Sequence, residues 1–367
     1  MASIIFADST SRYDGRDLER KPLGGTESSL IRLARALAQR GHDVTAVTDC
    51  DGVVEDQGVR WQPFGAALPA ECDLYIPLQH PRLFGLVSNP RRLAVWVVWR
   101  GNNLKHHKQL PRMWWYRPIP VLMSLMQVRQ YSRFLPRRNP HIVIPLGLPD
   151  DIRGFQPLES APGPELIFAS NPARNLHGIV RIWADQIFPA RPDGKLRIFG
   201  AVAPVVDPWK EWSGGLLPAD LSDRVRASIE IRTAVPRSEL IAAMRKSRGL
   251  IYLGHKTEAF CLTLAEAQAM GVPCVVAPIA VLPERVIDGV TGFVRGDEKS
   301  FAAAAISLLN DDQLWRRQHE AALRLQQGLT WAEVAARFEH ALLSDRIPTD
   351  SMLPREIPAI VEQEDRK

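Results

Sequence analysis

The sequence predicts an α/β protein made of two doubly wound halves. Short apolar runs bounded by turn or helix signals recur along the chain, as parallel strands covered on both faces require. This alternation occurs twice, before residue 149 and again from residue 165, with a segment rich in Pro, Gly and Asp between the two. The 367 residues, 46% of them hydrophobic, are enough for two cores.

The first half opens with a strand at residues 3–7 and a polar loop to residue 23. Gly24 and Gly25 then introduce a helix with Thr26 as its expected N-cap, and Gly41 ends it before a strand at 43–48. This βαβ unit lacks the G-x-G-x-x-G fingerprint, which disfavours NAD binding. Further strands are expected at 59–61, 73–77, 93–98, 120–125 and 142–145, with helices at 81–87 and 128–135.

The second half repeats the pattern. Strands are expected at 166–170, 196–200, 229–232, 250–253, 274–277 and 292–294, and helices at 176–188, 219–227, 237–246 and 261–270 and from 298 onward. We therefore expect an N-terminal domain at 1–150, completed by the helix at 331–344, and a second domain at 165–330. A linker at 151–164 joins them, and residues 345–367 form a polar tail.

Glu258 and Glu266 flank the start of the helix expected at 261–270. Helical side chains lean toward the N-terminus, so Glu266 reaches back toward the level of Glu258. The free N–H groups at that end suit phosphate, whereas the carboxylates suit sugar hydroxyls on either side. The pattern therefore indicates a sugar nucleotide. A bare pair at this spacing is more often a helix cap and a solvated residue, but a strand before it and a strand after it favour the ligand hypothesis.

Charge is unevenly distributed along the chain, whose net charge is +5. No Asp or Glu occurs between Asp73 and Asp150, where Arg and Lys are frequent. This basic segment, residues 82–138, also contains Trp114, Trp115 and Tyr116, which predicts contact with an anionic membrane surface or with a phosphorylated or acidic acceptor. A solvated positive face is the alternative, and the absence of any RNA-binding motif argues against nucleic acid.

The four cysteines show no disulfide or zinc spacing, which fits a reducing compartment. We expect a cytoplasmic protein, peripheral on the cytoplasmic membrane face. Because no Asp-x-Asp triplet stands at a strand end, no metal is expected, and no cofactor beyond the nucleotide-sugar substrate.

The chain resembles the retaining glycosyltransferases of family 4, which have the GT-B fold of two facing Rossmann-like domains with a cleft between them. The resemblance rests on residues 24–30 (Gly-Gly-Thr-Glu-Ser-Ser-Leu), 33–44, 168–176 (Phe-Ala-Ser-Asn-Pro-Ala-Arg-Asn-Leu) and, most strongly, 258–294. It implies that the second domain binds a UDP- or GDP-linked sugar and the first an acceptor. Glu266 would then bind the ribose and Glu258 the transferred sugar, with the backbone of Phe260, Cys261 and Leu262 near the pyrophosphate.

The resemblance also assigns further donor-site residues. Arg174 follows a strand at the carboxyl edge of the second sheet, where a guanidinium can neutralise the leaving diphosphate, although a surface arginine is the alternative. The family usually has an Arg and a Lys in this loop. Here Ser170 or Asn171 stands at the second position, and Lys256 is a candidate substitute. Ala234 and Val235 resemble the segment that contacts the base.

On the acceptor side, Gly24 and Gly25 would let the backbone approach the diphosphate or the acceptor, or simply form a turn with positive φ. Many family members place a His after the strand at 93–98. In this chain Arg100 or Asn102 takes that place, and His106 and His107 belong to the basic loop. The catalytic set expected is therefore Glu258, Arg174 and Arg100.

The resulting hypothesis is a retaining transferase that moves a sugar from a nucleotide to a glycan, glycolipid or other cell-surface acceptor. The alternatives are another GT-B enzyme, such as a nucleotide-sugar epimerase or a sugar-phosphate-transferring synthase, and a non-catalytic anion-binding protein on the same fold.

Overall fold

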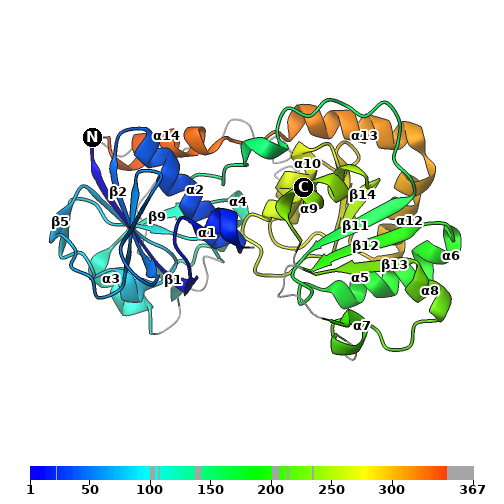
Figure 1. Ribbon diagram of the computed structural model, residues 1–367, viewed down its shortest axis with the longest axis horizontal. Helices are drawn as coiled ribbons and strands as arrows, with labels where there is room; N and C mark the ends of the chain where they lie inside the picture. The colour runs from blue at the N-terminus through cyan, green and yellow to red at the C-terminus, as the bar shows by residue number, and fades with distance from the viewer. Residues whose placement is uncertain are drawn as a thin grey trace. The chain divides into compact units, whose positions relative to one another are not determined.

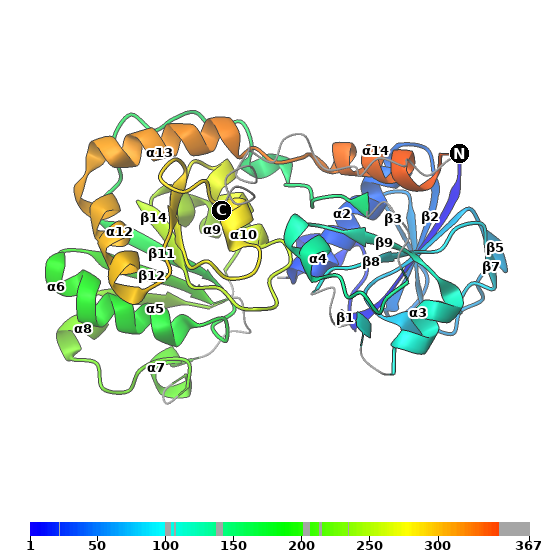
Figure 2. The same ribbon diagram turned by 180° about the vertical axis from the view of Figure 1, so that it is seen from behind.

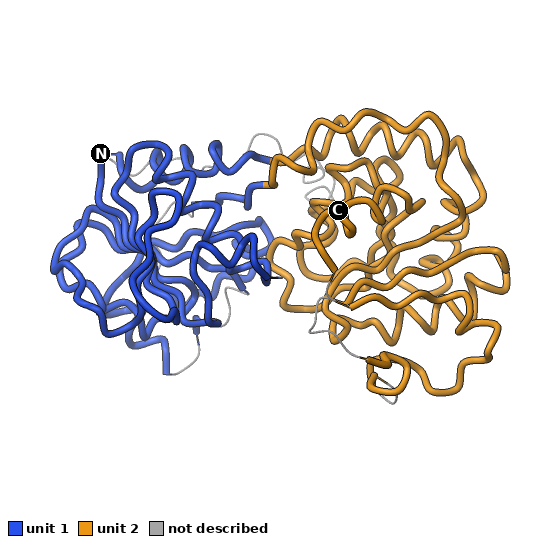
Figure 3. Tube along the Cα trace, in the orientation of Figure 1, with its two compact units in different colours: residues 1–147, 329–357 blue, residues 148–328, 358–367 orange. Residues whose placement is uncertain are grey.

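The computed structural model describes residues 1–21, 23–99, 104–105, 108–136, 142–200, 206–212, 215–233 and 235–344. The chain forms two compact units (Figures 1 and 3). Unit 1 comprises residues 1–147 and 329–357, and unit 2 comprises residues 148–328 and 358–367.

Unit 1 is built on a mainly parallel sheet in the order β3-β4-β2-β1-β6. Bridges from Tyr75 to Leu93 and from Leu78 to Trp96 connect β6 to a second parallel sheet, in the order β10-β9-β8. Only β3 runs antiparallel, against β4. The strands are β1 (Ser3–Arg12), β2 (Asp43–Asp49), β3 (Val54–Asp56), β4 (Val59–Pro63), β6 (Leu74–Pro77), β8 (Ala94–Trp96), β9 (Ile119–Leu122) and β10 (Ile142–Val143), with a small pair β5 (Glu71–Cys72) and β7 (Asn89–Pro90).

The helices of unit 1 are short except for α2 and α14. They are α1 (Asp17–Arg20), α2 (Gly25–Gln39), η1 (Pro81–Leu83), α3 (Leu110–Tyr116), α4 (Leu125–Gln130) and α14 (Trp331–Leu342). Although α14 comes last in the chain, it packs on α2. Glu339 of α14 accepts hydrogen bonds from Arg40 at 2.5 and 2.7 Å and lies 2.7 Å from His42 Nε2. Phe338 meets the buried Trp96 edge to face, with ring centroids 5.6 Å apart.

Three helix predictions in unit 1 need correction. Thr26 is not the N-cap, because α2 begins at Gly25 and the carbonyl of Gly24 already accepts the N–H of Ser28 at 3.1 Å. The helix expected at 81–87 is only the 3₁₀ turn η1. The helix expected at 128–135 starts earlier and ends at Gln130, because the Ser124 hydroxyl caps it through the N–H of Gln127 at 3.3 Å.

Unit 2 contains a six-stranded, fully parallel sheet in the order β13-β12-β11-β14-β15-β16. Numbered along this unit, the order is 3-2-1-4-5-6, that of the doubly wound nucleotide-binding fold. The strands are β11 (Glu165–Ser170), β12 (Lys195–Gly200), β13 (Ile229–Arg232), β14 (Gly249–Tyr252), β15 (Cys274–Val276) and β16 (Gly292–Val294). The centre of the sheet is fully buried, as its apolar runs predict.

The helices of unit 2 cover this sheet, and α12 packs against β14, β15 and β16 (Figure 2). They are η3 (Asp150–Ile152), α5 (Leu176–Ile182), η4 (Trp183–Ile187), α6 (Phe188–Ala190), α7 (Pro208–Glu211), α8 (Asp223–Ala227), α9 (Arg237–Arg245), α10 (Leu262–Ala269), α11 (Leu282–Arg285), α12 (Glu298–Asn310) and α13 (Asp312–Leu325).

Two differences from the sequence predictions are local in origin. The segment expected as one helix at 176–188 contains a π-helical turn, η4, between α5 and α6. The helix expected from residue 219 begins only at Asp223, because Ser222 caps it by accepting the N–H of Val225 at 3.4 Å. Within the part of the chain that the structure describes, no helix is both long and apolar enough to cross a bilayer.

Candidate functional site

The carboxyl ends of β11 and β14 form the switch point of the sheet in unit 2. After β11 the chain continues on one side of the sheet, through β12, and it later returns on the other side at β14. Open α/β sheets bind ligands at such a point. Ser170 ends β11 and Tyr252 ends β14, and their hydroxyl oxygens lie 3.3 Å apart. The strand order therefore places this pair where a ligand is expected.

Glu258 is buried just beyond this pair, with 4% of its surface exposed. Its Oε1 accepts a hydrogen bond from the Tyr252 hydroxyl and forms an ion pair with Nη1 of Arg174. Burial, followed by the charges of Cys261 and Glu258, raises the pKa of Tyr252, so the phenol remains a donor. Burial alone would lower the pKa of Arg174, but the Glu258 carboxylate outweighs it and raises that pKa.

Arg174 reaches Glu258 from a tight turn that follows β11. Within this turn, the N–H of Arg174 donates to the carbonyl of Asn171 at 2.9 Å, and Asn171 Oδ1 accepts the N–H of Ala173 at 2.9 Å. The Arg174 side chain remains 40% exposed. One part of the guanidinium is thus held by Glu258 while another part faces solvent, which leaves it able to bind an anion. Asn171 already uses its side-chain oxygen to shape the turn.

Helix α10 begins with an unusual backbone conformation. Its N-cap is Cys261, a non-glycine residue with φ of 62°, and no side chain caps the helix. The first helical hydrogen bond runs from the N–H of Ala265 to the carbonyl of Cys261 at 3.2 Å. The N–H groups that precede Ala265 therefore have no carbonyl partner within the helix. Phe260 and Cys261 are buried and Leu262 is half-buried. The backbone at this point can therefore serve as an anion-binding end.

Glu266 lies in the second turn of α10 and is paired with Arg237. Arg237 Nη2 lies 3.0 Å from Glu266 Oε1, and the same guanidinium bonds Asp151 at 2.8 and 3.2 Å. Arg237 was not among the residues predicted from the sequence. The sequence did indicate that it needs an acidic partner, because Arg237 is the first residue of α9 and a positive charge at a helix N-terminus opposes the helix dipole.

Arg285 is a second residue that the sequence analysis missed. Its guanidinium carbon lies 4.6 Å from the ring centroid of Phe260, directly beside the start of α10. Its Nε is buried without a hydrogen-bond partner among the described residues, and burial lowers the pKa of the Arg285 guanidinium. Nothing in the sequence around Arg285 indicates this position, because Arg285 and Phe260 belong to separate elements.

The other residues predicted from the sequence are less informative. Lys256 is exposed in the loop before Glu258, and Val235 is half-buried before α9. Ala234 and Arg100, like Asn102 and His106, lie outside the described residues. Within the described ranges, no group of three or more His, Cys, Asp or Glu is arranged to hold a metal ion.

Gly24 and Gly25 are exposed at the start of α2 in unit 1. The alternative that this turn needs positive φ is wrong for Gly24, because its φ is −65°. A side chain there would instead meet the carboxylate of Glu27, since an added Cβ would lie 2.4 Å from Oε2. Glycine at this position therefore keeps the backbone close to Glu27.

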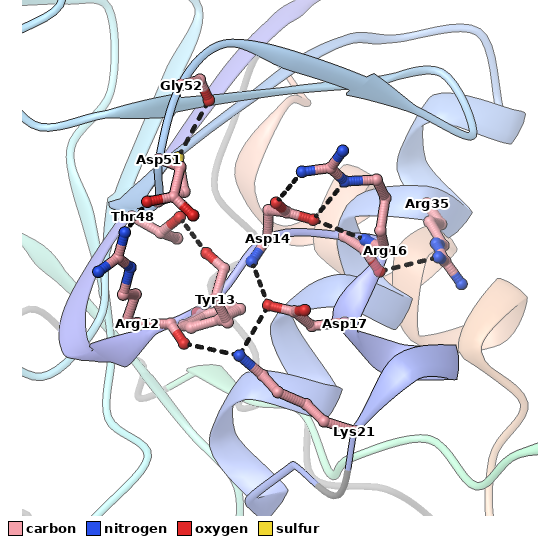
Figure 4. A network of polar contacts seen from close by, with 12 residues as sticks. Arg12, Tyr13, Asp14, Arg16, Asp17, Lys21, Arg35, Thr48, Asp51 and Gly52 are labelled. Atoms are coloured by element: carbon pink, nitrogen blue, oxygen red, sulfur yellow. Dashed lines mark hydrogen bonds and ion pairs between the residues drawn. The ribbon is translucent and has the colours of Figure 1, made fainter.

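The polar loop before Gly24 is ordered by a network of hydrogen bonds and ion pairs (Figure 4). Asp14 pairs with Arg16 at 2.7 Å, and Lys21 bonds both Asp17 at 2.9 Å and the carbonyl of Arg12 at 3.1 Å. The buried Arg35 of α2 donates to the carbonyl of Gly15 at 3.0 Å. The loop is thereby fixed to α2 through Arg35.

Two doubly wound units in one chain are the architecture of the GT-B class of fold. Solved glycosyltransferase structures share this fold over nearly the whole chain. Sucrose-phosphate synthase from Thermosynechococcus elongatus aligns with a TM-score of 0.71 and 15% identity over 92% of this chain and 97% of that one. Anabaena HepE, solved in complex with UDP and glucose, aligns with a TM-score of 0.71 and 15% identity over 94% of this chain and 100% of that one. The predicted fold class is confirmed.

The sequence comparisons cover part of the chain. Residues 190–324 match the family model described as Glycosyl transferases group 1. D-inositol 3-phosphate glycosyltransferase from Corynebacterium glutamicum is 32% identical over 119 residues, which are 32% of this chain and 28% of the relative. N-acetyl-alpha-D-glucosaminyl L-malate synthase from Bacillus anthracis is 35% identical over 88 residues, 23% of each protein. The matched segments thus span about a quarter of the length of these relatives.

Proposed function

We propose that the protein is a retaining glycosyltransferase of family 4 that moves a sugar from a nucleotide sugar to a glycan, glycolipid or other cell-surface acceptor. The observation that carries this proposal is the buried Glu258, held by Tyr252 and Arg174 at the switch point of a group 1 domain. A carboxylate buried with an arginine at a ligand-binding edge matches a site for sugar hydroxyls beside a diphosphate.

In this proposal a different protein group binds each part of the nucleotide-sugar donor. Glu266 accepts hydrogen bonds from the ribose, and Glu258 accepts them from the transferred sugar. The N–H groups at the start of α10 and the guanidinium of Arg174 bind the diphosphate. The sequence left the second phosphate cation unassigned, with Lys256 as a candidate. We assign this role to Arg285, because it lies beside Phe260 and its buried Nε has no hydrogen-bond partner among the described residues.

The chemistry follows from where charge develops. The bond between the anomeric carbon and the diphosphate oxygen breaks, and the acceptor oxygen bonds to the same face of that carbon. The acceptor proton passes to the departing phosphate oxygen. The protein mainly stabilises negative charge on the diphosphate, through Arg174 and the helix terminus, and positions the two substrates. HepE was solved with UDP-glucose, which supports a UDP-linked donor here.

We also propose peripheral binding to an anionic membrane through an aromatic patch on unit 1. The patch consists of exposed aromatic side chains beside cations of the basic segment: Trp114, Trp115, Tyr116, Phe134, Arg112 and Arg133. Trp115 is 84% exposed and Phe134 is 57% exposed, with the Arg133 guanidinium 5.1 Å from the Phe134 ring centroid. Aromatic rings beside cations suit the interface of an anionic bilayer.

Donor binding is tested first by the thermal shift of the intact protein with UDP-, GDP- and ADP-linked sugars. One class should stabilise the wild type, and Glu258→Gln and Arg174→Ala should reduce that shift and abolish turnover. Turnover that survives in both variants would refute the assigned site. Incubation with donor alone separates the alternatives, because an epimerase changes the sugar configuration without an acceptor. A non-catalytic protein would show no turnover with any donor.

A further inference from the structure

The sheet of unit 1 has a switch point of its own, between β1 and β6. The chain continues from β1 to β2 on one side, and the strands after β6 extend the sheet on the other side. The carboxyl end of β6 leads directly into Leu78, Gln79 and His80. Arg82, two residues further on, donates to the hydroxyl of Ser9 at 2.8 Å, and Ser9 belongs to the last part of β1. The segment after β6 is therefore held at the edge where open α/β sheets place ligands.

A cavity of about 410 Å³ opens at this position. Two short segments line it, one after β6 and one leading into α3: His80, Pro81, Arg82, Lys108, Gln109 and Arg112. The volume falls within the range of small-molecule sites. The described lining residues all belong to unit 1.

The walls of this cavity carry positive charge, and no Asp or Glu is among the described residues that line it. Arg82, Lys108 and Arg112 each contribute a cation, and none of them forms an ion pair with any residue that the structure describes. Arginines elsewhere behave differently, since Arg174 and Arg237 each have a carboxylate partner. Burial, and then the charge of Arg82, lower the pKa of His80, so the imidazole is a neutral hydrogen-bonding group at pH 7.

Gln109 adds a second kind of binding group. Its Oε1 is buried and has no hydrogen-bond partner among the residues that the structure describes, although most buried polar atoms are paired. A carboxamide oxygen can only accept, so it requires a donor such as a hydroxyl. Cations that suit phosphate thus lie beside an acceptor that suits a hydroxyl, as recognition of a phosphorylated polyol requires.

We propose that this cavity binds a phosphomonoester group on the acceptor, with Arg82, Lys108 and Arg112 around the phosphate and Gln109 on a neighbouring hydroxyl. The inference rests on the proposed function only in calling the ligand an acceptor. Phosphate binding by the cavity and donor binding by unit 2 are separate measurements, so either can fail alone.

The test titrates the full chain with inorganic phosphate and with glucose 6-phosphate by calorimetry at constant ionic strength. The wild type should bind glucose 6-phosphate more tightly than phosphate. The double variant Lys108→Glu and Arg112→Glu should lose both by at least tenfold. Gln109→Leu should keep the phosphate affinity and lose the preference for the sugar phosphate.

Arg129→Glu is the matched control, because Arg129 is exposed on α4 in the same basic segment and outside the cavity. It should bind both probes like the wild type. Equal losses in Arg129→Glu and in the cavity variants would show non-specific charge attraction and overturn the proposal. Absence of phosphate binding in a wild type that still shows a nucleotide-sugar thermal shift would overturn it while leaving the proposed function intact.

A second experiment tests whether the bound phosphate belongs to a lipid headgroup or to a soluble ligand. Vesicles of phosphatidylcholine are prepared with the same charge density of either phosphatidic acid, a phosphomonoester, or phosphatidylglycerol, a phosphodiester. Preference for phosphatidic acid that the Lys108 and Arg112 substitutions remove would assign a lipid headgroup. Equal binding to both vesicles, with glucose 6-phosphate still bound, would assign a soluble ligand.

Discussion

Arg174 and Glu258 form an ion pair across the switch point of unit 2, although 84 residues separate them in the chain. Arg174 arrives from the turn after β11 and Glu258 from the turn after β14, and these two strands are neighbours in the sheet. The pair is asymmetric, because the Glu258 side chain is 5% exposed and that of Arg174 is 40% exposed. Glu258 therefore orients a guanidinium that still faces solvent.

Replacing Glu258 by Gln should reduce both activity and stability. The variant keeps the shape of the side chain but removes the charge that accepts hydrogen bonds from Arg174 and Tyr252. We expect a loss of about 1–3 kcal/mol in the free energy of unfolding, measured in urea, and at least a ~100-fold loss of turnover. Glu230→Gln is the control, since Glu230 pairs with Arg197 at 3.3 Å but is 45% exposed. Equal stability losses in the two variants would contradict the special position of Glu258.

Replacing Glu266 by Ala should weaken donor binding more than it affects folding. Arg237 would lose one carboxylate partner but keep Asp151, so the loop before α9 remains anchored. A hydroxyl bonded to a charged group contributes about 1.5–3 kcal/mol, so the Kd for the nucleotide sugar should rise by ~10- to 100-fold. Glu239→Ala, which removes the exposed partner of Arg232, should leave that Kd unchanged. An unchanged Kd in Glu266→Ala would remove Glu266 from the donor site.

The sequence was sufficient to predict the fold class because each strand is a short apolar run between helix or turn signals. The sequence also predicted the strand, polar turn and helix that carry Glu258 and Glu266, because the signals for these three elements follow one another directly. Helix ends were less predictable. Near Thr26 and Ser222 several small polar residues could each have been the N-cap, so the sequence did not determine at which residue the helix begins.

The partners of the two glutamates could not be predicted, because they depend on strand order. Arg237 meets Glu266 only because the segment after β13 and the helix after β14 reach the same edge of the sheet. Arg285 meets Phe260 for a similar reason, across α11 and the start of α10. Neither relation leaves a periodic pattern in the sequence. The roles of Glu258, Arg174 and Glu266 in catalysis and binding stay predictions.

Three of the four cysteine thiols, those of Cys72, Cys261 and Cys274, should be unreactive in the folded protein. Burial raises the pKa of Cys72 to about 11 and that of Cys274 to about 12, and burial followed by the Glu258 charge raises the pKa of Cys261 as well. At pH 8 roughly a thousandth or less of Cys72 and Cys274 is thiolate. The reaction of these three thiols with Ellman's reagent should be slow in the native protein and fast once guanidinium has unfolded the chain. Rapid native labelling of Cys261, located by mass spectrometry, would show that α10 begins in a more open state.

Trp115 should contribute to membrane binding without supporting the fold. Its side chain is 84% exposed, so Trp115→Ser should change the free energy of unfolding by less than ~0.5 kcal/mol. Sedimentation with vesicles containing phosphatidylglycerol should show several-fold weaker binding than for the wild type. Leu325→Ser is the control, because Leu325 is an exposed apolar residue of α13 in the other unit. Equal binding by wild type and Trp115→Ser would exclude Trp115 from the membrane contact.

Glu339 should make the stability of unit 1 depend on pH. Hydrogen bonds from the Arg40 guanidinium lower its pKa from the ordinary 4.5, with His42 as a further donor. A carboxylate whose pKa is lowered by folding stabilises the native state above its unfolded pKa, and this stabilisation is lost as the pH falls through the lower folded value. Because Arg40 is 40% exposed, the contribution should be only about 0.5–1 kcal/mol.

The comparison is between wild type and Glu339→Gln in urea unfolding from pH 7 to pH 3. The difference in free energy should be full at pH 6–7, well above the ordinary pKa of 4.5, and should disappear at the acid end. Glu71→Gln, which removes an exposed carboxylate of the same unit, is the control for the loss of one negative charge. A difference between wild type and Glu339→Gln that stays constant down to pH 3 would mean that lost packing of α14 on α2, and not the ion pair, accounts for the effect of Glu339.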